Sequence, residues 1–201
     1  MKVSVIMGHP NKKSFNYAIA ETVMSQLTRL GHEVFFHDLY EEGFDAVMTG
    51  YELVNGISKD ALVEQHCKEV EEAEGIIIIH PNWWGQPPAI LKGWVDRVLR
   101  MGVAYDERKD DKGVSSPIGL LKTKVVIVFN TSNTPEKHEV EVLKDPLETL
   151  WKNCIFSFCG VKNVHRKMFR IIEASTLEER NQWLKEAEGM VNEHFALRDR
   201  M

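Results

Sequence analysis

The sequence has little cysteine. Its three cysteines, Cys67, Cys154 and Cys159, include no C-x-x-C pair. An odd number with this spacing argues against both a disulfide framework and a cysteine-rich zinc site. We therefore expect reduced thiols, no bound metal and a cytoplasmic location.

The chain also lacks long apolar runs and basic blocks. The apolar stretch at the N-terminus is interrupted at Gly8, which makes it too short for a signal peptide, and no later run approaches the roughly 20 residues of a membrane span. Thirty acidic side chains against twenty-five basic ones give a net charge of −5. These features argue against membrane insertion, docking on anionic membranes and non-specific nucleic-acid binding.

Short apolar runs and longer amphipathic segments alternate along the chain. The apolar runs predict strands at 3–7, 33–37, 75–80, 124–129 and 164–172. Helical spacing predicts helices at 15–30, 60–73, 88–99, 143–151 and 177–195, whereas 38–59 is expected to be a long loop with one helical turn and 106–112 a charged loop. This alternation predicts an α/β fold, in which one domain over residues 1–201 has a parallel sheet with helices on both faces.

Ligands bind at the carboxyl ends of the strands in such sheets, so the loops after the strands carry the functional information. The loop after the first strand, 8–16, matches neither the G-x-G-x-x-G dinucleotide motif nor a P-loop, and it holds no cysteine nucleophile. It ends in Ser14 at a helix start, with Lys12 and Lys13 beside it. A helix N-terminus with such neighbours suits a phosphate monoester. The alternative is that Ser14 only caps the helix and that His9 is an ordinary turn residue.

Two tryptophans follow the third strand. Trp83 and Trp84 stand next to Gly85 and between Pro81 and the Pro87-Pro88 pair. Because adjacent residues of an extended loop point in different directions, we expect at least one indole to face the ligand crevice, where it can stack on a flat aromatic ligand. The alternative is that both plug the junction of helix and sheet. Small polar residues follow the fourth strand (Asn130, Thr131, Ser132 and Asn133), and the three loops together suit flavin mononucleotide (FMN).

Further patterns stand out at residues 8–18, 38–40, 81–94, 97–98 and 102–105. These segments resemble the NAD(P)H quinone dehydrogenase family, the flavodoxin-like DT-diaphorases and their bacterial relatives. The likeness runs from about residue 2 to 160 and is most specific in the block 84–105. It implies a flavodoxin-like three-layer sandwich with a five-stranded parallel sheet, a homodimer, and non-covalent FMN or FAD. It further implies that NADPH or NADH donates a hydride to the flavin, which then passes two electrons to a quinone-like acceptor.

The resemblance also implies roles for particular residues. The flavin phosphate region would be held by His9, Ser14, Phe15 and Asn16, the isoalloxazine would be lined by Pro81, Asn82, Trp83 and Trp84, and its pyrimidine side would meet Asn130, Thr131, Ser132 and Asn133. Tyr105 would close the acceptor pocket, from the partner subunit.

The chain departs from the family pattern at several places, including Glu107 in place of a second tyrosine near Tyr105 and Leu143 or Lys144 in place of a histidine. Asn130 to Asn133 replace a Thr-Thr-Gly-Gly loop, and His138 stands where the family has a tyrosine that stabilises reduced flavin. We hypothesise that His138 serves as a cation beside reduced flavin; a plain surface histidine is the alternative. The chain lacks the C-terminal region with which longer relatives hold adenine, which favours FMN over FAD. The choice between NADH and NADPH stays open.

Two other functions fit the same resemblance. Some relatives are cytosolic ancillary subunits of potassium-efflux antiporters, and flavodoxins are plain electron carriers. The modest net charge of −5 and the walled pocket both argue against the carrier, which would need a strongly acidic docking face and only an exposed flavin edge.

Overall fold

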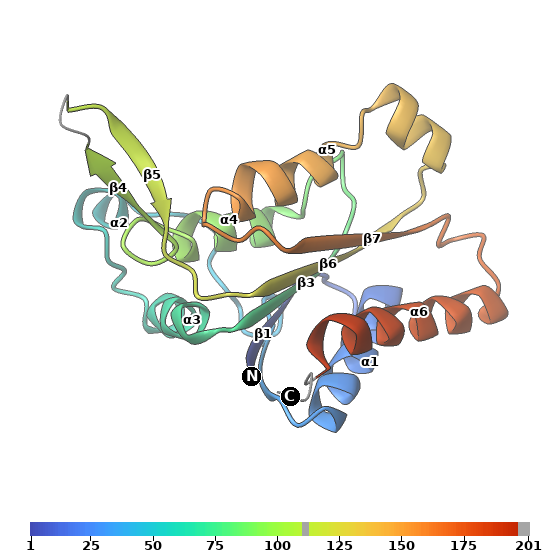
Figure 1. Ribbon diagram of the computed structural model, residues 1–201. Helices are drawn as coiled ribbons and strands as arrows, with labels where there is room; N and C mark the ends of the chain where they lie inside the picture. Colours follow the sequence, from blue (N-terminus) through green and yellow to red (C-terminus); the bar gives the residue numbers. More distant parts are fainter. Residues whose placement is uncertain (110–112, 197–201) are drawn as a thin grey trace.

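The computed structural model describes residues 1–109 and 113–196. Five parallel strands form its main sheet in the order β2-β1-β3-β6-β7 (Figure 1). These strands are β1 (Lys2–Met7), β2 (Glu33–Asp38), β3 (Gly75–Pro81), β6 (Val125–Ser132) and β7 (Val164–Arg170). The predicted fold class, a flavodoxin-like five-stranded parallel sheet flanked by helices, is confirmed.

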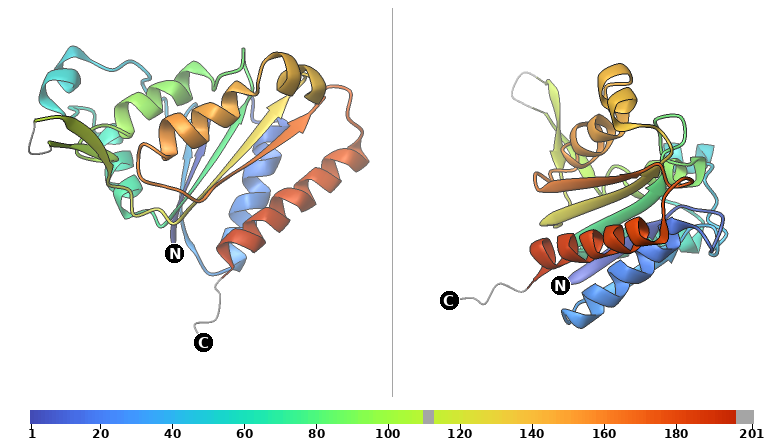
Figure 2. Two further views of the ribbon diagram at one scale, coloured as in Figure 1. Left: turned by 45° about the horizontal axis from the view of Figure 1, so that its top comes forward. Right: turned by 90° about the vertical axis from the view of Figure 1, so that its right-hand side faces the viewer.

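Helices cover both faces of this sheet (Figure 2). One face carries α1 (Phe15–Arg29) and α6 (Leu177–Phe195); the other carries α3 (Ala61–Glu72), α4 (Ala89–Val98) and the π-helical η2 (Thr149–Phe156). Strand β3 is buried at every position. Ile77 and Ile79 pack in the core beneath α1 and α6, whereas Ile76 and Ile78 pack in the core on the opposite face. This is why β3 is a continuous apolar run. Among the described residues, no helix has the length and apolar character that a membrane crossing requires.

The expectation of a charged loop at 106–112 is wrong for the residues that the structure describes. Strand β4 (Tyr105–Lys109) pairs antiparallel with β5 (Ser115–Gly119) in a hairpin that projects from the body (Figure 1); residues 110–112 lie outside the described ranges. Almost every side chain of β4 is exposed. A strand without a buried face shows no apolar alternation, so the sequence pattern could not reveal it.

The single helix expected over 143–151 is also wrong. The segment instead contains the short α5 (Pro146–Glu148) and the first residues of η2, and a separate π-helical turn, η1 (His138–Val142), precedes it. Lys144 and Asp145 interrupt it with positive φ angles of 61° and 45°. The Asp145 side chain caps α5 by accepting a hydrogen bond from the Glu148 N–H (3.3 Å), and Pro146 takes the first helical position.

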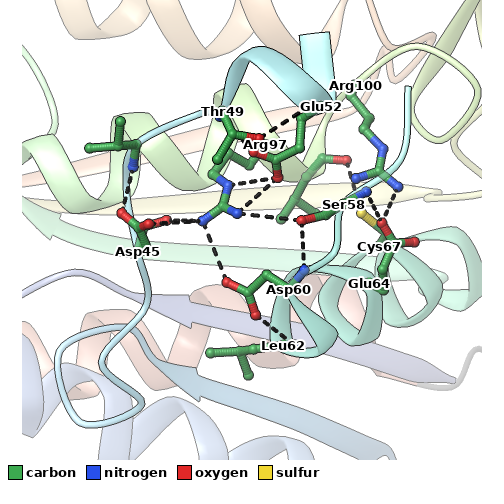
Figure 3. A network of polar contacts seen from close by, with 12 residues as sticks. Asp45, Thr49, Glu52, Ser58, Asp60, Leu62, Glu64, Cys67, Arg97 and Arg100 are labelled. Atoms are coloured by element: carbon green, nitrogen blue, oxygen red, sulfur yellow. Dashed lines mark hydrogen bonds and ion pairs between the residues drawn. The ribbon is translucent and has the colours of Figure 1, made fainter. Parts of the chain in front are cut away.

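The long connection 38–59 contains α2 (Gly50–Asn55) and is fixed to α4 by a buried arginine (Figure 3). Arg97 donates hydrogen bonds to the Glu52 carboxylate, through Nε at 3.0 Å, and to the Asp45 carbonyl oxygen. The backbone of Ala46 lies so close to α4 that a Cβ on Gly93 would stand 2.2 Å from its carbonyl oxygen. The loop is therefore packed as part of the protein body.

Candidate functional site

A pocket of about 520 Å³ opens at the carboxyl edge of the sheet. Three loops that the sequence singled out meet there, after β1, β3 and β6. The predicted residues that line it are His9, Ser14, Phe15, Asn16, Pro81, Asn82, Trp83, Thr131, Ser132 and Asn133. Its volume lies in the usual range of small-molecule sites, roughly 300–1,000 Å³.

The loop after β1 is a compact polar turn at the start of α1. Ser14 caps α1 by accepting a hydrogen bond from the Tyr17 N–H (3.4 Å), so the capping interpretation is confirmed while Ser14 also lines the pocket. The His9 Nδ1 accepts the Asn11 N–H at 3.0 Å, and partial burial lowers the pKa of His9, which favours a neutral ring at pH 7. Lys13 lines the pocket, whereas Lys12 pairs with Glu41 outside it.

The loop after β3 is folded into a tight turn. Trp83 and Gln86 exchange two backbone hydrogen bonds of 3.0 Å, and the central residues Trp84 and Gly85 have positive φ angles of 58° and 72°, as in a type I′ turn. Trp83 is 42% exposed and lines the pocket, whereas Trp84 is fully exposed and lies outside the pocket lining. Because neither indole is buried, the alternative that they plug the sheet junction is wrong.

Asn16, which lines the pocket, has a buried polar atom that lacks a partner among the described residues. Its Nδ2 donates to the Thr131 Oγ1 at 2.9 Å, while its Oδ1 has no hydrogen-bond partner within residues 1–109 and 113–196. A hydroxyl both donates and accepts, so this pair can present either an oxygen or an N–H group to a ligand. Leaving such a group unsatisfied costs about 1–3 kcal/mol, which suggests that a polar ligand completes the site.

Asn130 lies beneath the pocket lining and is fully buried. Its Nδ2 donates to the His80 Nε2 at 2.8 Å, which also accepts the Trp151 indole N–H at 2.9 Å. The His80 Nδ1–H in turn donates to the Pro81 carbonyl oxygen at 2.8 Å. Burial lowers the pKa of His80 to about 3, so the ring is neutral and this arrangement is its natural tautomer. Asn130 and His80 thus support the loop after β3 from below.

Two further predicted residues lie outside this pocket. Tyr105 packs edge-on against Phe158, with ring centroids 4.8 Å apart, and lines a separate hollow between α2 and α4. His138 is exposed at the start of η1 and is not part of the pocket lining. The roles that we expect for them stay predictions.

Sequence reasoning missed the residues that approach from the C-terminal part of the chain. Ile172, Glu173 and Arg180 line the pocket from this side. Arg180 donates to the Ser175 Oγ (2.8 Å) and the Ile172 carbonyl oxygen (2.9 Å), and within residues 1–109 and 113–196 it forms no ion pair. The segment after β7 ends at the same sheet edge as the other loops, and this topological rule could have revealed it.

Comparisons with known proteins agree with this geometry. A family model described as a flavodoxin-like fold matches residues 1–194. A Haemophilus influenzae protein named as an uncharacterized NAD(P)H oxidoreductase is 38% identical over 82% of this chain and 81% of its own length. The rat ribosyldihydronicotinamide dehydrogenase [quinone] is 31% identical over 91% of this chain and 87% of its own length.

A solved structure gives the same result. The crystal structure of a Streptococcus mutans UA159 protein superimposes with a TM-score of 0.83 at 31% identity, covering 96% of this chain and all of the other. The family-model match over residues 1–194 includes all three loops around the pocket. The chain therefore belongs to the flavodoxin-like family of NAD(P)H quinone oxidoreductases.

Proposed function

We propose that the protein binds a flavin in the pocket at the carboxyl edge of the sheet and uses it to reduce quinone-like acceptors with NADPH or NADH. The observation that carries this proposal is that Trp83 and the N-terminus of α1 meet in one pocket. An aromatic wall and a phosphate-binding helix end in one cavity are the two elements that a flavin nucleotide requires. A bound flavin supplies the redox chemistry by accepting a hydride from the nicotinamide and passing two electrons to the acceptor.

The phosphate would lie at the start of α1. The first backbone N–H groups of α1 and the hydroxyl of Ser14 face this end, and Lys13 and Arg180 bring positive charge to it. No ion pair of either cation is found in the part of the chain that the structure describes. Their charge is therefore available to a phosphate group.

The ring system would lie against the loop after β3. The Trp83 indole offers a stacking face, and the pair of Asn16 and Thr131 offers the missing hydrogen bond to a polar group of the flavin. Ser132 and Asn133, at the pocket wall, would meet the polar edge of the ring. FMN needs no adenine site, so we propose FMN as the flavin, with FAD as the alternative.

We further propose that two copies of the chain form a homodimer. Apolar side chains are exposed around the hollow between α2 and α4, namely Val47, Leu53, Val54, Ile57 and Met101. Soluble monomers rarely expose an apolar patch of this kind. Tyr105 lines the same hollow, so a partner seated there would bring Tyr105 close to a second subunit, as expected for a residue that closes the acceptor pocket.

The test is a spectrum of the purified protein followed by reduction without air. We expect a yellow protein that bleaches when NADPH or NADH is added and regains its colour with a quinone; dihydronicotinamide riboside is a third donor to try, given the name of the rat relative. A yellow protein that no donor bleaches would indicate a carrier or a regulatory subunit. A colourless protein that takes up no added flavin would contradict the proposal.

Replacing the indole that lines the pocket tests the binding geometry. We expect Trp83→Ala to weaken FMN binding about tenfold, because stacking and buried area are lost. Quenching of FMN fluorescence during titration measures the dissociation constant. Tyr51→Ala, which removes a partly exposed aromatic side chain on α2 away from the pocket, should leave the constant unchanged.

A further inference from the structure

A buried glutamate lies directly behind the pocket wall. Glu139, on η1, is fully buried, and both of its carboxylate oxygens accept hydrogen bonds. Its Oε1 accepts from the Asn82 Nδ2, and its Oε2 accepts from the Arg170 Nε at 3.2 Å. Asn82 belongs to the loop after β3 and Arg170 to the end of β7, so one side chain connects three segments at the sheet edge.

The ionised form of Glu139 fits these contacts. The amide nitrogen of Asn82 and the guanidinium of Arg170 are donors only, so neither could accept a proton from a carboxylic acid. Burial raises the pKa of Glu139 above its ordinary value; the positive charge of Arg170 opposes this and the negative charge of Asp145 adds to it. The ion pair with Arg170 therefore offsets part of the cost of burying the carboxylate.

The contact with Glu139 fixes which way the Asn82 amide faces. With Nδ2 turned to Glu139, the Asn82 Oδ1 accepts the Gly85 N–H at 2.9 Å. Gly85 is the residue of the turn that follows Trp84. If the amide were rotated by half a turn, its nitrogen would face the Gly85 N–H and this hydrogen bond would be lost.

We propose that Glu139 is a positioning residue of the flavin site, which holds the Asn82 amide in the orientation that fastens the Trp83–Gln86 turn beside the pocket. The role rests on the proposed function, because its purpose is to preorganise the Trp83 face for the flavin ring. Glu139 does not line the pocket and acts through Asn82.

The isosteric variant Glu139→Gln tests this role. The glutamine side chain has one acceptor oxygen, whereas both Asn82 and Arg170 donate to this position. If that oxygen accepts from Arg170, the glutamine NH₂ group faces the Asn82 NH₂ group, and the Asn82 amide must rotate to present its oxygen instead. We expect the Gly85 amide proton of the flavin-free protein to exchange with solvent about tenfold faster, because its hydrogen bond is lost. We expect FMN to bind about tenfold more weakly.

Exchanging the carboxylate and the amide between positions 139 and 82 should restore both Gly85 protection and FMN binding. In Glu139→Gln with Asn82→Asp, the new aspartate accepts from Gly85 and from the glutamine NH₂, while the glutamine oxygen accepts from Arg170. We expect Gly85 exchange and FMN affinity to return toward wild type, which a loss of general packing would not produce. Glu136→Gln is the matched control, because Glu136 is exposed and contacts the same arginine at 3.5 Å without touching Asn82.

Two results would overturn the proposal. Gly85 exchange that is unchanged in Glu139→Gln would show that the glutamate does not fasten the turn. Faster exchange with unchanged FMN affinity would show that the turn does not serve the flavin. If the wild type itself bound no flavin, the proposed function would fail and this role with it, while the exchange rates of the flavin-free protein would still decide whether Glu139 orients Asn82.

Discussion

Trp84 has a backbone conformation that its residue type disfavours. Its φ of 58° lies in the left-handed region, where a bulky side chain is strained by about 1–3 kcal/mol, and its indole makes no compensating contact because it is fully exposed. Strain of this kind persists at sites where the conformation serves a ligand or a partner. The position of Trp84 next to the pocket agrees with that interpretation.

Replacing Trp84 with a residue that favours positive φ should relieve this backbone strain. Trp84→Asn creates the Asn-Gly pair that type I′ turns prefer, so we expect the free energy of unfolding to rise by about 1 kcal/mol. Urea denaturation of the flavin-free protein measures it. Gly85→Ala should have the opposite effect, since φ at this position is 72° and a Cβ would lie 2.8 Å from the Pro146 Cγ. Lower stability of Trp84→Asn would contradict the strain argument.

A second residue-scale feature is a buried histidine between two glutamates. The His37 Nδ1 lies 2.8 Å from the Glu42 Oε1, and its Nε2 contacts Glu69. Burial lowers the pKa of His37, but the hydrogen bonds and charges of Glu42 and Glu69 outweigh it and leave the pKa raised. His66 stacks on His37, with ring centroids 3.7 Å apart.

Ligand atoms of His37, Glu42 and His66 lie within 4.8 Å of one another, a spacing at which such groups could hold a metal ion. The Trp94 indole N–H donates to the His66 Nδ1 at 3.0 Å. The neutral ring must then carry its proton on Nε2, which faces the Glu42 Oε2 at 3.3 Å. In this arrangement His66 presents an N–H group rather than a lone pair to the Glu42 carboxylate, and the two histidines form one polar network with Glu42 and Glu69.

The network makes stability depend on pH. Because the folded-state pKa of His37 is raised above 6.5, its contribution is fully present below pH 6.5 and is lost as the pH rises through the folded-state value. We expect the urea midpoint of the wild type to fall over this alkaline interval, and that of His37→Gln to fall less. His138→Gln, at an exposed histidine, is the control and should follow the wild type.

In acid, the same network loses a different contribution to stability, that of the ionised Glu42 carboxylate. Burial would raise the pKa of Glu42, but its contacts with His37 and His66 lower it to about 2, from an ordinary value of 4.5. Its stabilising contribution is therefore present above pH 4.5 and is lost as the pH falls from 4.5 towards 2.

At the scale of helices and strands, the sequence predicted those elements whose buried side chains recur at a regular spacing. The strands of the main sheet were located to within a few residues, and the signal was clearest in the buried apolar runs of β1, β3 and β6. The hairpin β4–β5 was missed because its charged side chains lie in water, and η1 and η2 were missed because π-helical turns depart from the 3.6-residue period. Exposed and irregular elements leave no periodic signal.

The attachment of α2 to α4 should depend on Arg97. Its guanidinium is buried and meets the equally buried Glu52 carboxylate, with Nη2 2.8 Å from Oε1 (Figure 3). Arg97→Met leaves Glu52 unpaired in the interior, and we expect a loss of about 3–5 kcal/mol in the free energy of unfolding. Lys92→Met removes an exposed ion pair with Asp96 on the same helix and should cost at most about 0.5 kcal/mol. Equal losses in both variants would contradict this account.

At the scale of the whole molecule, the sheet topology explains why most residues of the candidate site could be predicted from the sequence. All five strands of the main sheet are parallel, so the loops after β1, β3 and β6 meet at one edge although their residues are far apart in the sequence. The contributions of Arg180 and Glu139 could not be predicted in the same way. Arg180 lies where the resemblance has faded, and the contact of Glu139 with Asn82 depends on the irregular path of η1.

The last expectation concerns the second copy of the chain. Leu53, on α2, is 76% exposed beside the hollow that contains Tyr105. If this surface joins two subunits, Leu53→Lys places a charge in an apolar interface and should shift the dimer towards the monomer in sedimentation equilibrium. Leu177→Lys is the matched control, because Leu177 is 75% exposed at the start of α6, outside this surface.

The same variant connects assembly with activity. The pocket proposed for the flavin shares no lining residue with the hollow that contains Tyr105. We therefore expect Leu53→Lys to retain FMN while quinone reduction falls, since Tyr105 would no longer reach a neighbouring site. A wild type that sediments as a monomer at every concentration would contradict the dimer. A dimer that Leu53→Lys leaves intact would show that the subunits meet through another face, and Tyr105 would then lose its proposed role in closing the acceptor pocket.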